Sequence, residues 1–331
     1  MRHFFYLLIF ILLTFLETKA QDNASVKTEK IASRLTDRMS VFLNMRYQYS
    51  DAGEGLSSFD IRRARIDFRN EIIPSIDCRV VVEFAGDPKI LDAFVNWHSI
   101  SAFNIVAGEF KVPFSLENAY ATYALEMADN SMVIAELGKH NDASAIYWRD
   151  IGVNFYGKFL PVKDYNVFEY SVALLNGNGI NVSDDNKSKD FSGIFSIYPL
   201  KEITLSASHY NGSIRQQDKN IQRVCTGGSA RYDNNKLLVR GEYIYGTTGD
   251  MNSDGYYVVA GYFVHPKIQT LLKYDHFRKD ISMKKTWRTN YIVGINYFPI
   301  KNFHFKLNYS FRTTVGSPDV NHIALQFLTL F

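Results

Sequence analysis

Arginine and lysine at every second position are the residues of this chain that are best placed to do chemistry. Within residues 59–69, Arg63, Arg65 and Arg69 alternate with apolar side chains such as Ile66. A period of two is the pattern of a β-strand with one apolar and one polar face. The three guanidinium groups would then share one face, and rows of Arg and Lys beside water attract anions and phosphates.

The same parity brings charges of both signs onto the polar faces of later strands. The candidate cations for a solute-facing wall are Arg63, Arg65, Arg69, Arg79, Lys111, Arg240, Lys273, Lys306 and Arg312. Carboxylates fall on the same faces, at Asp67, Glu83, Glu109, Glu242 and Asp275. Two interpretations remain open: the cations favour anions, or the opposite charges pair across strands and keep the wall polar and rigid.

The elements that would position these charges are β-strands. From Met39 onward the period-two pattern persists, and it is clearest in residues 303–312. Candidate strands lie near residues 39, 59, 76, 90, 102, 145, 165, 189, 202, 222, 236, 255, 267, 287, 303 and 320. About sixteen strands of roughly ten residues predict an all-β, antiparallel barrel that spans a membrane.

The links between the candidate strands alternate in length, as short periplasmic turns and longer external loops do in such barrels. Short links lie at 73–75, 99–101, 161–164, 199–201, 233–235, 265–267 and 299–301. Longer polar links lie at 176–189, 212–222, 246–254, 278–285 and 313–319. An Arg or Lys facing lipid near the midplane would cost about 2 to 4 kcal/mol, so we expect the polar faces to line a water-filled lumen.

The two ends of the chain indicate export to the outer membrane of a Gram-negative bacterium. Residues 1–20 combine a basic start, an apolar run and small residues, and predict a signal peptide. Residues 21–38 predict a periplasmic N-terminal segment, and residues 39–331 predict the barrel. The last strand ends on Phe331 and resembles the terminal strand by which outer-membrane barrels are recognised for insertion.

Composition narrows the class of protein. The net charge is +3, from 37 basic and 34 acidic residues, and this balance argues against a nucleic-acid binder. The 21 Tyr and 25 Phe suit the aromatic girdles of a membrane barrel. Cys78 and Cys225 are too few for a disulfide framework, and residues 184–190 lack the central Gly and closing Glu of a calcium loop. We expect no metal and no cofactor.

One external link, at residues 114–144, is much longer than the others. A loop of this length usually has a function, and folded inward it would narrow a wide barrel to a constriction. Its candidate solute-facing residues are Glu117, Glu126, Asp129, Glu136 and Lys139. The alternative is a surface loop or an extra strand pair around residues 132–137.

Three motifs in the first half are similar to those of the phosphate-selective porin O and P family. They are FDIRRARI at 59–66, LDAFV at 91–95 and GEFKVPFS at 108–115, and weaker similarity extends to about residue 200. The resemblance implies a trimeric barrel of about sixteen strands that forms an anion-preferring pore. It assigns residues 114–144 to the family's constriction loop. It also implies an arginine ladder and a lysine cluster at Arg63, Arg65, Arg69, Arg79 and Lys111.

The inserted loop departs from the family pattern, because its acidic residues outnumber Lys139. Phosphate selectivity therefore stays open, whereas pore function does not depend on it. We expect a passive pore for small anionic or polar solutes, surrounded by outer-membrane lipids and homotrimeric by the resemblance.

Two other classes of function compete with the pore. An outer-membrane enzyme would need a nucleophile, a His base and an acid near the rim, and the sequence has no Gly-x-Ser-x-Gly elbow. We therefore expect no enzymatic activity. A non-conducting barrel that acts as a receptor, adhesin or assembly platform is the main alternative, because the sequence does not exclude a plugged lumen. No plug-sized domain precedes Met39, which favours an open channel.

Overall fold

The computed structural model of the chain describes residues 38–138, 148–184, 187–216 and 219–331. The chain divides into two compact units, Met1–Ser40 and Val41–Phe331. The predicted signal peptide at 1–20 and residues 21–37 of the predicted periplasmic segment lie outside the described residues. The second unit is the barrel.

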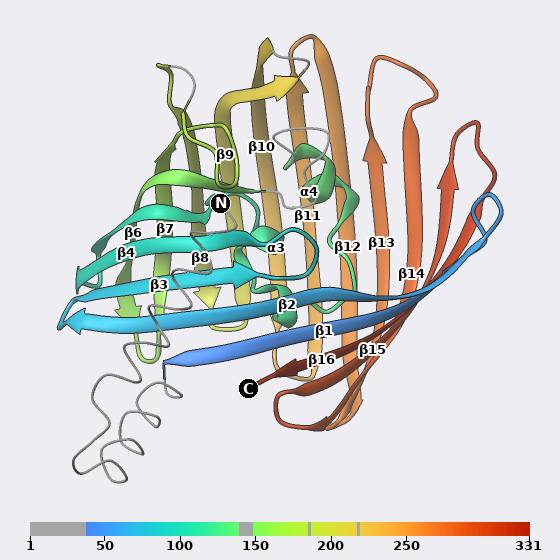
Figure 1. Ribbon diagram of the computed structural model, residues 1–331, viewed down its shortest axis with the longest axis horizontal. Helices are drawn as coiled ribbons and strands as arrows, with labels where there is room; N and C mark the ends of the chain where they lie inside the picture. The colour runs from blue at the N-terminus through green and yellow to red at the C-terminus, as the bar shows by residue number, and fades with distance from the viewer. Residues whose placement is uncertain (1–37, 139–147, 185–186, 217–218) are drawn as a thin grey trace, which may run out of the picture. The chain divides into compact units, whose positions relative to one another are not determined.

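The barrel is built almost entirely from strands. In chain order they are β1 Met39–Ser50, β2 Leu56–Ile73, β3 Ile76–Glu83, β4 Lys89–Ile100, β5 Phe103–Lys111, β6 Arg149–Val162, β7 Tyr165–Leu175, β8 Asp190–Leu200, β9 Ile203–Gln216, β10 Lys219–Asp233, β11 Leu237–Thr248, β12 Met251–His265, β13 Ile268–Arg278, β14 Trp287–Ile300, β15 Phe303–Thr314 and β16 Val320–Leu330. Neighbours in the chain are neighbours in the sheet, which closes on itself (Figure 1). The predicted antiparallel barrel of about sixteen strands is confirmed.

The first and last strands close the barrel. β1 pairs with β16 from Phe42, opposite Leu330, to Ser50, opposite His322. Beyond this ladder, backbone hydrogen bonds of 2.6 and 3.0 Å join residue 41 to the terminal residue 331. Hydrocarbon offers no partners to backbone groups, so a sheet can span it only when no edge is left open. The alternating C-terminal strand meets this requirement.

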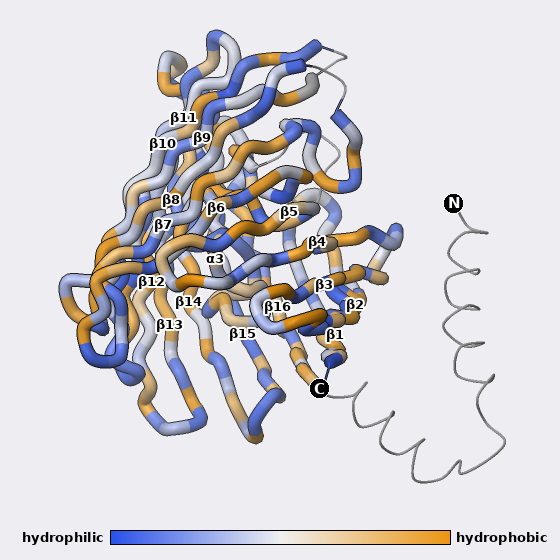
Figure 2. Tube along the Cα trace, turned by 90° about the vertical axis from the view of Figure 1, so that its left-hand side faces the viewer, coloured by the Kyte–Doolittle hydropathy of each residue, from blue (hydrophilic) through white to orange (hydrophobic). Residues whose placement is uncertain are grey.

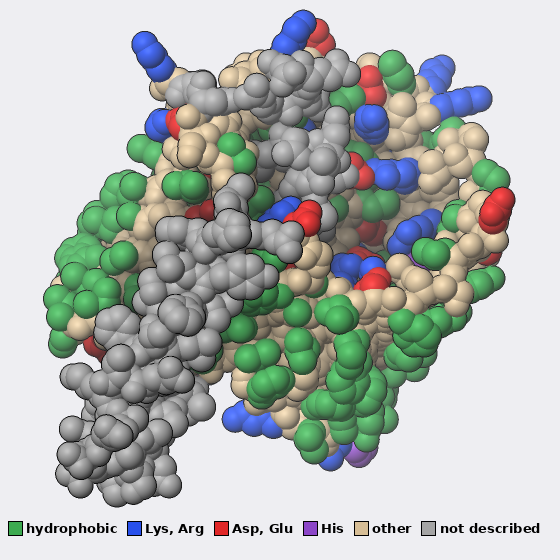
Figure 3. All heavy atoms as spheres, viewed as in Figure 1, with side chains coloured by type: hydrophobic (Ala, Val, Ile, Leu, Met, Phe, Trp, Pro, Cys, Tyr) green, Lys and Arg blue, Asp and Glu red, His purple; other side chains and the backbone are tan. Residues whose placement is uncertain are grey.

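Side chains alternate between the two faces of the sheet, as the mixed colours along each strand show (Figure 2). In β14, Tyr291, Val293 and Ile295 are exposed on the outside, whereas Asn290 and Asn296 are buried on the inside. Figure 3 shows charged side chains gathered in the hollow of the barrel and hydrophobic side chains on its flanks. The outward faces therefore suit lipid and the inward faces suit water.

Two of the predicted long external links are tight hairpins instead. β9 runs to Gln216 and β10 begins at Lys219, so most of the predicted link 212–222 is strand. β11 and β12 leave only Gly249 and Asp250 between them, where the sequence predicts a link at 246–254. The polar residues there continue the backbone ladder, because strand pairing does not require an apolar face.

β2 departs from strict alternation. Phe59 and Ile61 are exposed on its outer face, whereas the apolar residues further along, such as Ile66, occupy even positions. Between these two runs, Arg62 and Arg63 both point inward and form ion pairs there. Two successive inward residues mark a change of parity within the strand. The sequence pattern predicts constant parity here and leaves Arg62 out of the inner face.

Arginine at the centre of the outer face is expected to destabilise the barrel. Val293 lies midway along β14 and is exposed, so Val293→Arg should cost about 2 to 4 kcal/mol of unfolding free energy. Leu237→Arg, at the first residue of β11, is the matched control and should cost only about 0 to 1 kcal/mol, because it lies near the membrane interface. Urea titration of the protein folded into bilayers measures both losses. Equal losses would contradict the assigned lipid face.

Candidate pore constriction

The described part of the longest link, between β5 and β6, lies inside the barrel. Its described residues form α3 (Leu116–Ala119), the 3-10 helix η1 (Thr122–Ala124) and α4 (Met132–Leu137), within the ring of strands (Figure 1). The segment 112–138, with Trp148 at its far end, is called the inner loop below. The alternative of an extra strand pair at 132–137 is wrong, since those residues are helical. Lys139, a predicted constriction residue, lies outside the described residues.

The helices of this link are all short. Among the residues that the structure describes, no helix has the length and apolar character needed to cross a membrane.

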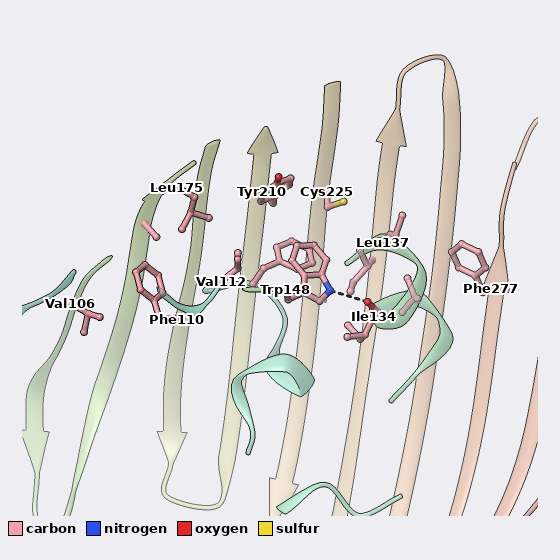
Figure 4. Close-up of a cluster of buried hydrophobic side chains, with 14 residues drawn as sticks. Val106, Phe110, Val112, Ile134, Leu137, Trp148, Leu175, Tyr210, Cys225 and Phe277 are labelled. Carbon is pink, nitrogen blue, oxygen red and sulfur yellow. Dashed lines mark hydrogen bonds between the residues drawn. The ribbon is translucent and has the colours of Figure 1, made fainter. Parts of the chain in front are cut away.

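α4 fixes the inner loop to the wall by shape. Its Val133 and Leu137 are buried in an apolar cluster that includes wall residues of β9, β10, β11 and β13 (Figure 4). Glycines make room for them: a Cβ on Gly255 would lie 2.7 Å from the Val133 Cβ, and a Cβ on Gly246 would lie 3.0 Å from the Leu137 Cδ1. Both distances are tighter than ordinary van der Waals contacts, so glycine in the wall admits the helix at this depth.

An aromatic stack ties the two ends of the inner loop to α4. The Trp148 ring stacks on Phe114 with 4.4 Å between ring centroids, and Tyr210 meets it edge-on at 5.7 Å. The Trp148 Nε1–H donates to the Ile134 carbonyl at 2.9 Å (Figure 4). A buried indole N–H is costly without such an acceptor. The stack therefore joins the entry and exit of the loop to its central helix.

Glu117 of α3 is the electrostatic centre of the inner loop. It is fully buried, with Arg240 at 3.5 Å and Lys273 at 4.0 Å, and it accepts hydrogen bonds from the backbone and hydroxyl of Ser131 at 2.6 and 2.7 Å. Burial raises the pKa of Glu117, whereas Lys273, Arg240 and Ser131 lower it, and the resulting pKa lies below its usual value. The carboxylate is thus held in its charged form.

Glu242 of β11 holds the start of α3. It accepts from the Ser115 hydroxyl at 2.9 Å, from the Leu116 N–H at 3.1 Å and from the Tyr257 hydroxyl at 3.2 Å. The first N–H groups of a helix have no partners within the helix, so a buried helix start needs an external acceptor. The wall carboxylate that sequence parity places in the lumen therefore works as a cap for the inner loop.

Further contacts fasten the inner loop around the rest of the wall. Asp129 forms an ion pair with Arg62 of β2, and Glu136 forms one with Arg288 of β14 at 2.9 Å. Wall side chains also donate to loop carbonyls: Lys306 to Leu125, Gln326 to Ala128 at 3.1 Å, and Asn296 to Glu126 at 2.9 Å. The inner loop is therefore attached to β2, β11, β13, β14, β15 and β16, and these contacts hold it across the lumen.

The contacts divide the predicted wall cations into two groups. Arg240, Lys273 and Lys306 are 2%, 5% and 2% exposed, and they hold the inner loop instead of facing open water. The others lie on β2, β3, β5 and β15: Arg63, Arg65, Arg69, Arg79, Lys111 and Arg312. Of these, Arg65 and Lys111 also donate to the inner loop. The predicted loop carboxylates Glu117, Glu126, Asp129 and Glu136 all pair with wall cations.

A narrow cavity of about 50 Å³ lies between the inner loop and the wall formed by β2, β5 and β6. Its charged lining consists of Arg63, Arg65, Lys111, Arg149 and Glu117. The Lys111 Nζ donates to the carbonyls of Asn118 and Tyr120 at 2.9 and 2.6 Å. Four basic side chains and one carboxylate therefore surround the narrow cavity.

Buried carboxylates of the wall stand beside these cations. Arg65 donates to Glu83 at 2.7 Å. Asp92 forms ion pairs with Arg149 and, at 3.0 Å, with Arg79. Each carboxylate orients its guanidinium partner and cancels part of its charge, so the cations are fixed in position at the cost of some field strength.

A larger cavity of about 390 Å³ lies against β13 to β16, toward the end of the barrel where the external links lie. Its charged lining includes Arg288, Arg312 and Asp129. Within the part of the chain that the structure describes, the Arg312 guanidinium has no hydrogen bond or ion pair. Asn130 lines both cavities, so this loop residue stands where the wide compartment meets the narrow one.

The predicted set omits Arg223, Arg231 and Arg288, which contact the inner loop. It also omits three further arginines of the lumen: Arg46, Arg62 and Arg149. Arg46 alternates with Met45 and Tyr47 in β1, so the period-two signal was available. Arg62 is hidden by the parity change in β2. Arg149 is the first residue of β6, and a strand end carries no alternation on one side. Among these last three, only the omission of Arg46 could have been avoided from the sequence.

Comparison with known families decides the class of this protein. The family model described as phosphate-selective porin O and P matches residues 34–236 and 235–318. The chain belongs to this family. The family and the barrel fold both indicate that this porin is a channel in the outer membrane of a Gram-negative bacterium. No curated protein sequence matches it.

Solved structures resemble this porin in fold. The anion-selective porin from Comamonas acidovorans is 12% identical, with a TM-score of 0.70, and the match covers 88% of this porin and 98% of that chain. The outer membrane channel DcaP of Acinetobacter baumannii is 15% identical, with a TM-score of 0.65 and coverage of 88% and 96%. OmpT of Vibrio cholerae, in its trimer form, is 11% identical, with a TM-score of 0.65 and coverage of 88% and 98%.

A side chain at Gly246, where the wall makes room for Leu137, is expected to displace α4. In Gly246→Val the new atoms would collide with Leu137, and overpacking of this kind costs about 1 to 3 kcal/mol. We expect a lower free energy of unfolding together with larger and noisier single-channel conductance. Gly228→Val on β10 is the matched control, because a Cβ there meets nothing within 4 Å. If both variants behave like the parent porin, α4 does not set the aperture.

Loss of the Glu117 charge is expected to loosen the inner loop. Because its pKa lies below the usual value, its ion pairs stabilise the fold fully above the ordinary Glu range, about pH 4.3, and are lost as the pH falls through the lower folded pKa. Single-channel recordings should therefore stay quiet down to about pH 4 and become noisy below it. Glu117→Gln should show the noise at pH 7, since removal of one partner from a buried pair costs about 3 to 5 kcal/mol.

Glu202→Gln, in the turn between β8 and β9, is the control for this experiment and should record like the parent. A Glu117→Gln channel that is quiet at pH 7 would show that the buried ion pairs do not hold the loop.

Proposed function

We propose that this porin is a passive pore that passes small hydrophilic solutes and prefers anions. One observation carries the proposal: the narrow cavity beside the inner loop is lined by four cations and a single carboxylate. Arg and Lys in the wall of a pore attract anions, and the field is stronger where the surroundings are poorly polarisable.

The acidic composition of the inner loop does not oppose this preference. Glu117 and Glu126 pair with Arg240, and Asp129 pairs with Arg62. These carboxylates are used to attach the loop, so they add little negative potential to the passage. The basic side chains of the narrow cavity, whose charge Glu83 and Asp92 cancel in part, act on a passing solute.

Phosphate is the finer candidate among anions. Guanidinium groups bind phosphate oxygens in a bidentate manner, and Arg63, Arg65 and Arg149 line one small cavity. The family name and the anion selectivity named for the Comamonas acidovorans porin are consistent with this choice. We also propose that the protein works as a homotrimer, as named for Vibrio cholerae OmpT, after export by its N-terminal signal.

Removal of cations from the narrow cavity is expected to reduce anion preference. At about 6 Å, one unit charge changes the energy of a passing ion by about 0.7 kcal/mol even in the dielectric of water, or roughly threefold in partition. The double variant Arg63→Gln with Arg65→Gln should therefore lower anion partition by roughly tenfold and raise cation partition by a similar factor. The anion-to-cation permeability ratio should then fall by up to roughly a hundredfold. The reversal potential of single channels in a salt gradient measures this ratio, and added phosphate tests block against chloride.

Lys158→Gln is the matched control, because Lys158 pairs with Glu169 near the periplasmic end of β6 and lies away from the cavity. The anion-to-cation permeability ratio of this variant should equal that of the parent. A parent channel that prefers cations would reject the anion proposal and keep the porin. A correctly folded parent without conductance would favour the non-conducting receptor or adhesin.

A further inference from the structure

The outer face of the barrel carries a groove that the pore does not use. It has a volume of about 450 Å³ and crosses β12 to β15. Its outward side chains are almost entirely apolar or aromatic: Val258, Ala260, Leu272, Val293, Tyr309 and Phe311. Solutes in the lumen cannot reach these residues, because they lie on the lipid side of the wall. A groove of this kind suits a flexible hydrocarbon chain.

A belt of aromatic rings borders the groove on the side of the external links, where Tyr274 and Tyr291 also line it. Tyr274 packs against Tyr256 and Tyr291 with centroids 5.8 and 5.3 Å apart, and His276 continues the belt to Trp287 at 6.1 Å. Tyr and Trp concentrate where hydrocarbon meets the headgroup layer. The belt therefore marks the external membrane interface and places the groove at the depth of the acyl chains.

The link between β13 and β14, next above the belt, is basic. Lys279, Lys284 and Lys285 are exposed, and none of them has a carboxylate partner among the residues that the structure describes. Arg278 also projects outward but is paired with Asp254. The single carboxylate within the link, Asp280, is turned back onto Ser282. Three unpaired ammonium groups thus stand at the height of lipid headgroups.

We propose that the face formed by β12 to β15 is a docking site for an outer-leaflet lipid with a phosphorylated headgroup. One acyl chain lies in the groove between Leu272 and Tyr309, and the phosphates contact Lys279, Lys284 and Lys285. Both parts of the molecule are recognised by chemistry that matches its own, apolar below the belt and cationic above it.

Charge complementarity favours this occupant over a second copy of the chain. A second copy that met this face across a two-fold axis would bring the same three lysines against it, and like charges brought together across an interface are repelled. An anionic headgroup instead supplies negative charge to all three ammonium groups. The lipid therefore fits the basic part of the site, which a copy related by a two-fold axis does not.

The test uses the full chain folded in non-ionic detergent, with native mass spectrometry to count retained lipids. The probes are diphosphorylated lipid A, its dephosphorylated form and phosphatidylethanolamine. We expect the parent to retain only the diphosphorylated lipid, and inorganic phosphate at equal concentration not to displace it. The triple variant K279E/K284E/K285E should bind it roughly tenfold or more weakly. Lys219→Glu, at the same end of the barrel on β10, is the matched control and should bind like the parent.

A second variant tests the groove without a change of charge. Ala260→Trp fills the groove from β12 and should also reduce lipid retention. All these side chains lie outside the lumen, so each variant should keep the parent conductance, which separates this proposal from the proposed pore.

Equal retention in all variants would overturn the site. Displacement by inorganic phosphate, or full retention by Ala260→Trp, would leave a phosphate patch without an acyl groove. An oligomer that falls apart in these variants would make the face a subunit contact.

Discussion

The backbone of a membrane-spanning sheet has no water to bond with, and this single requirement governs the rest of the structure. It forces the sheet to close, which here means that β1 pairs with β16 along its length. Closure then fixes parity, because each strand must show apolar side chains to lipid and polar ones to the lumen. The clustering of charge inside the barrel is a consequence of this constraint.

A barrel of sixteen strands encloses a wide lumen, and the chain fills part of it with its own loop. The inner loop has two kinds of attachment. Apolar knobs of α4 enter glycine notches in β11 and β12, and buried ion pairs surround Glu117. These pairings also explain why the lumen needs both signs of charge. Arg240 and Lys273 pair with loop carboxylates, whereas Arg65 and Lys111 donate to loop oxygens and also line the narrow cavity.

The sequence predicts the barrel well because alternation is a local property that is repeated many times. It also places the long loop between the correct strands and marks Arg240, Lys273 and Lys306 as inward. It does not reveal that these three side chains lie beneath the loop, since the helices of the loop are too short to show a period and their contacts join residues over a hundred positions apart. The parity change in β2 is missed for a related reason: one irregular residue reverses parity without changing composition.

The attachment of the inner loop has a consequence for the surface of the cell. The described contacts of α3 and α4 go to inward side chains of the wall, at residues such as Arg240, Glu242 and Asp275, and not to the links that face the exterior. The described part of the inner loop and the links that face the exterior are thus separate parts of the chain. Exposed links can therefore accumulate substitutions under pressure from antibodies or phages without a change in the width of the pore. The range of solutes that the channel admits then stays the same.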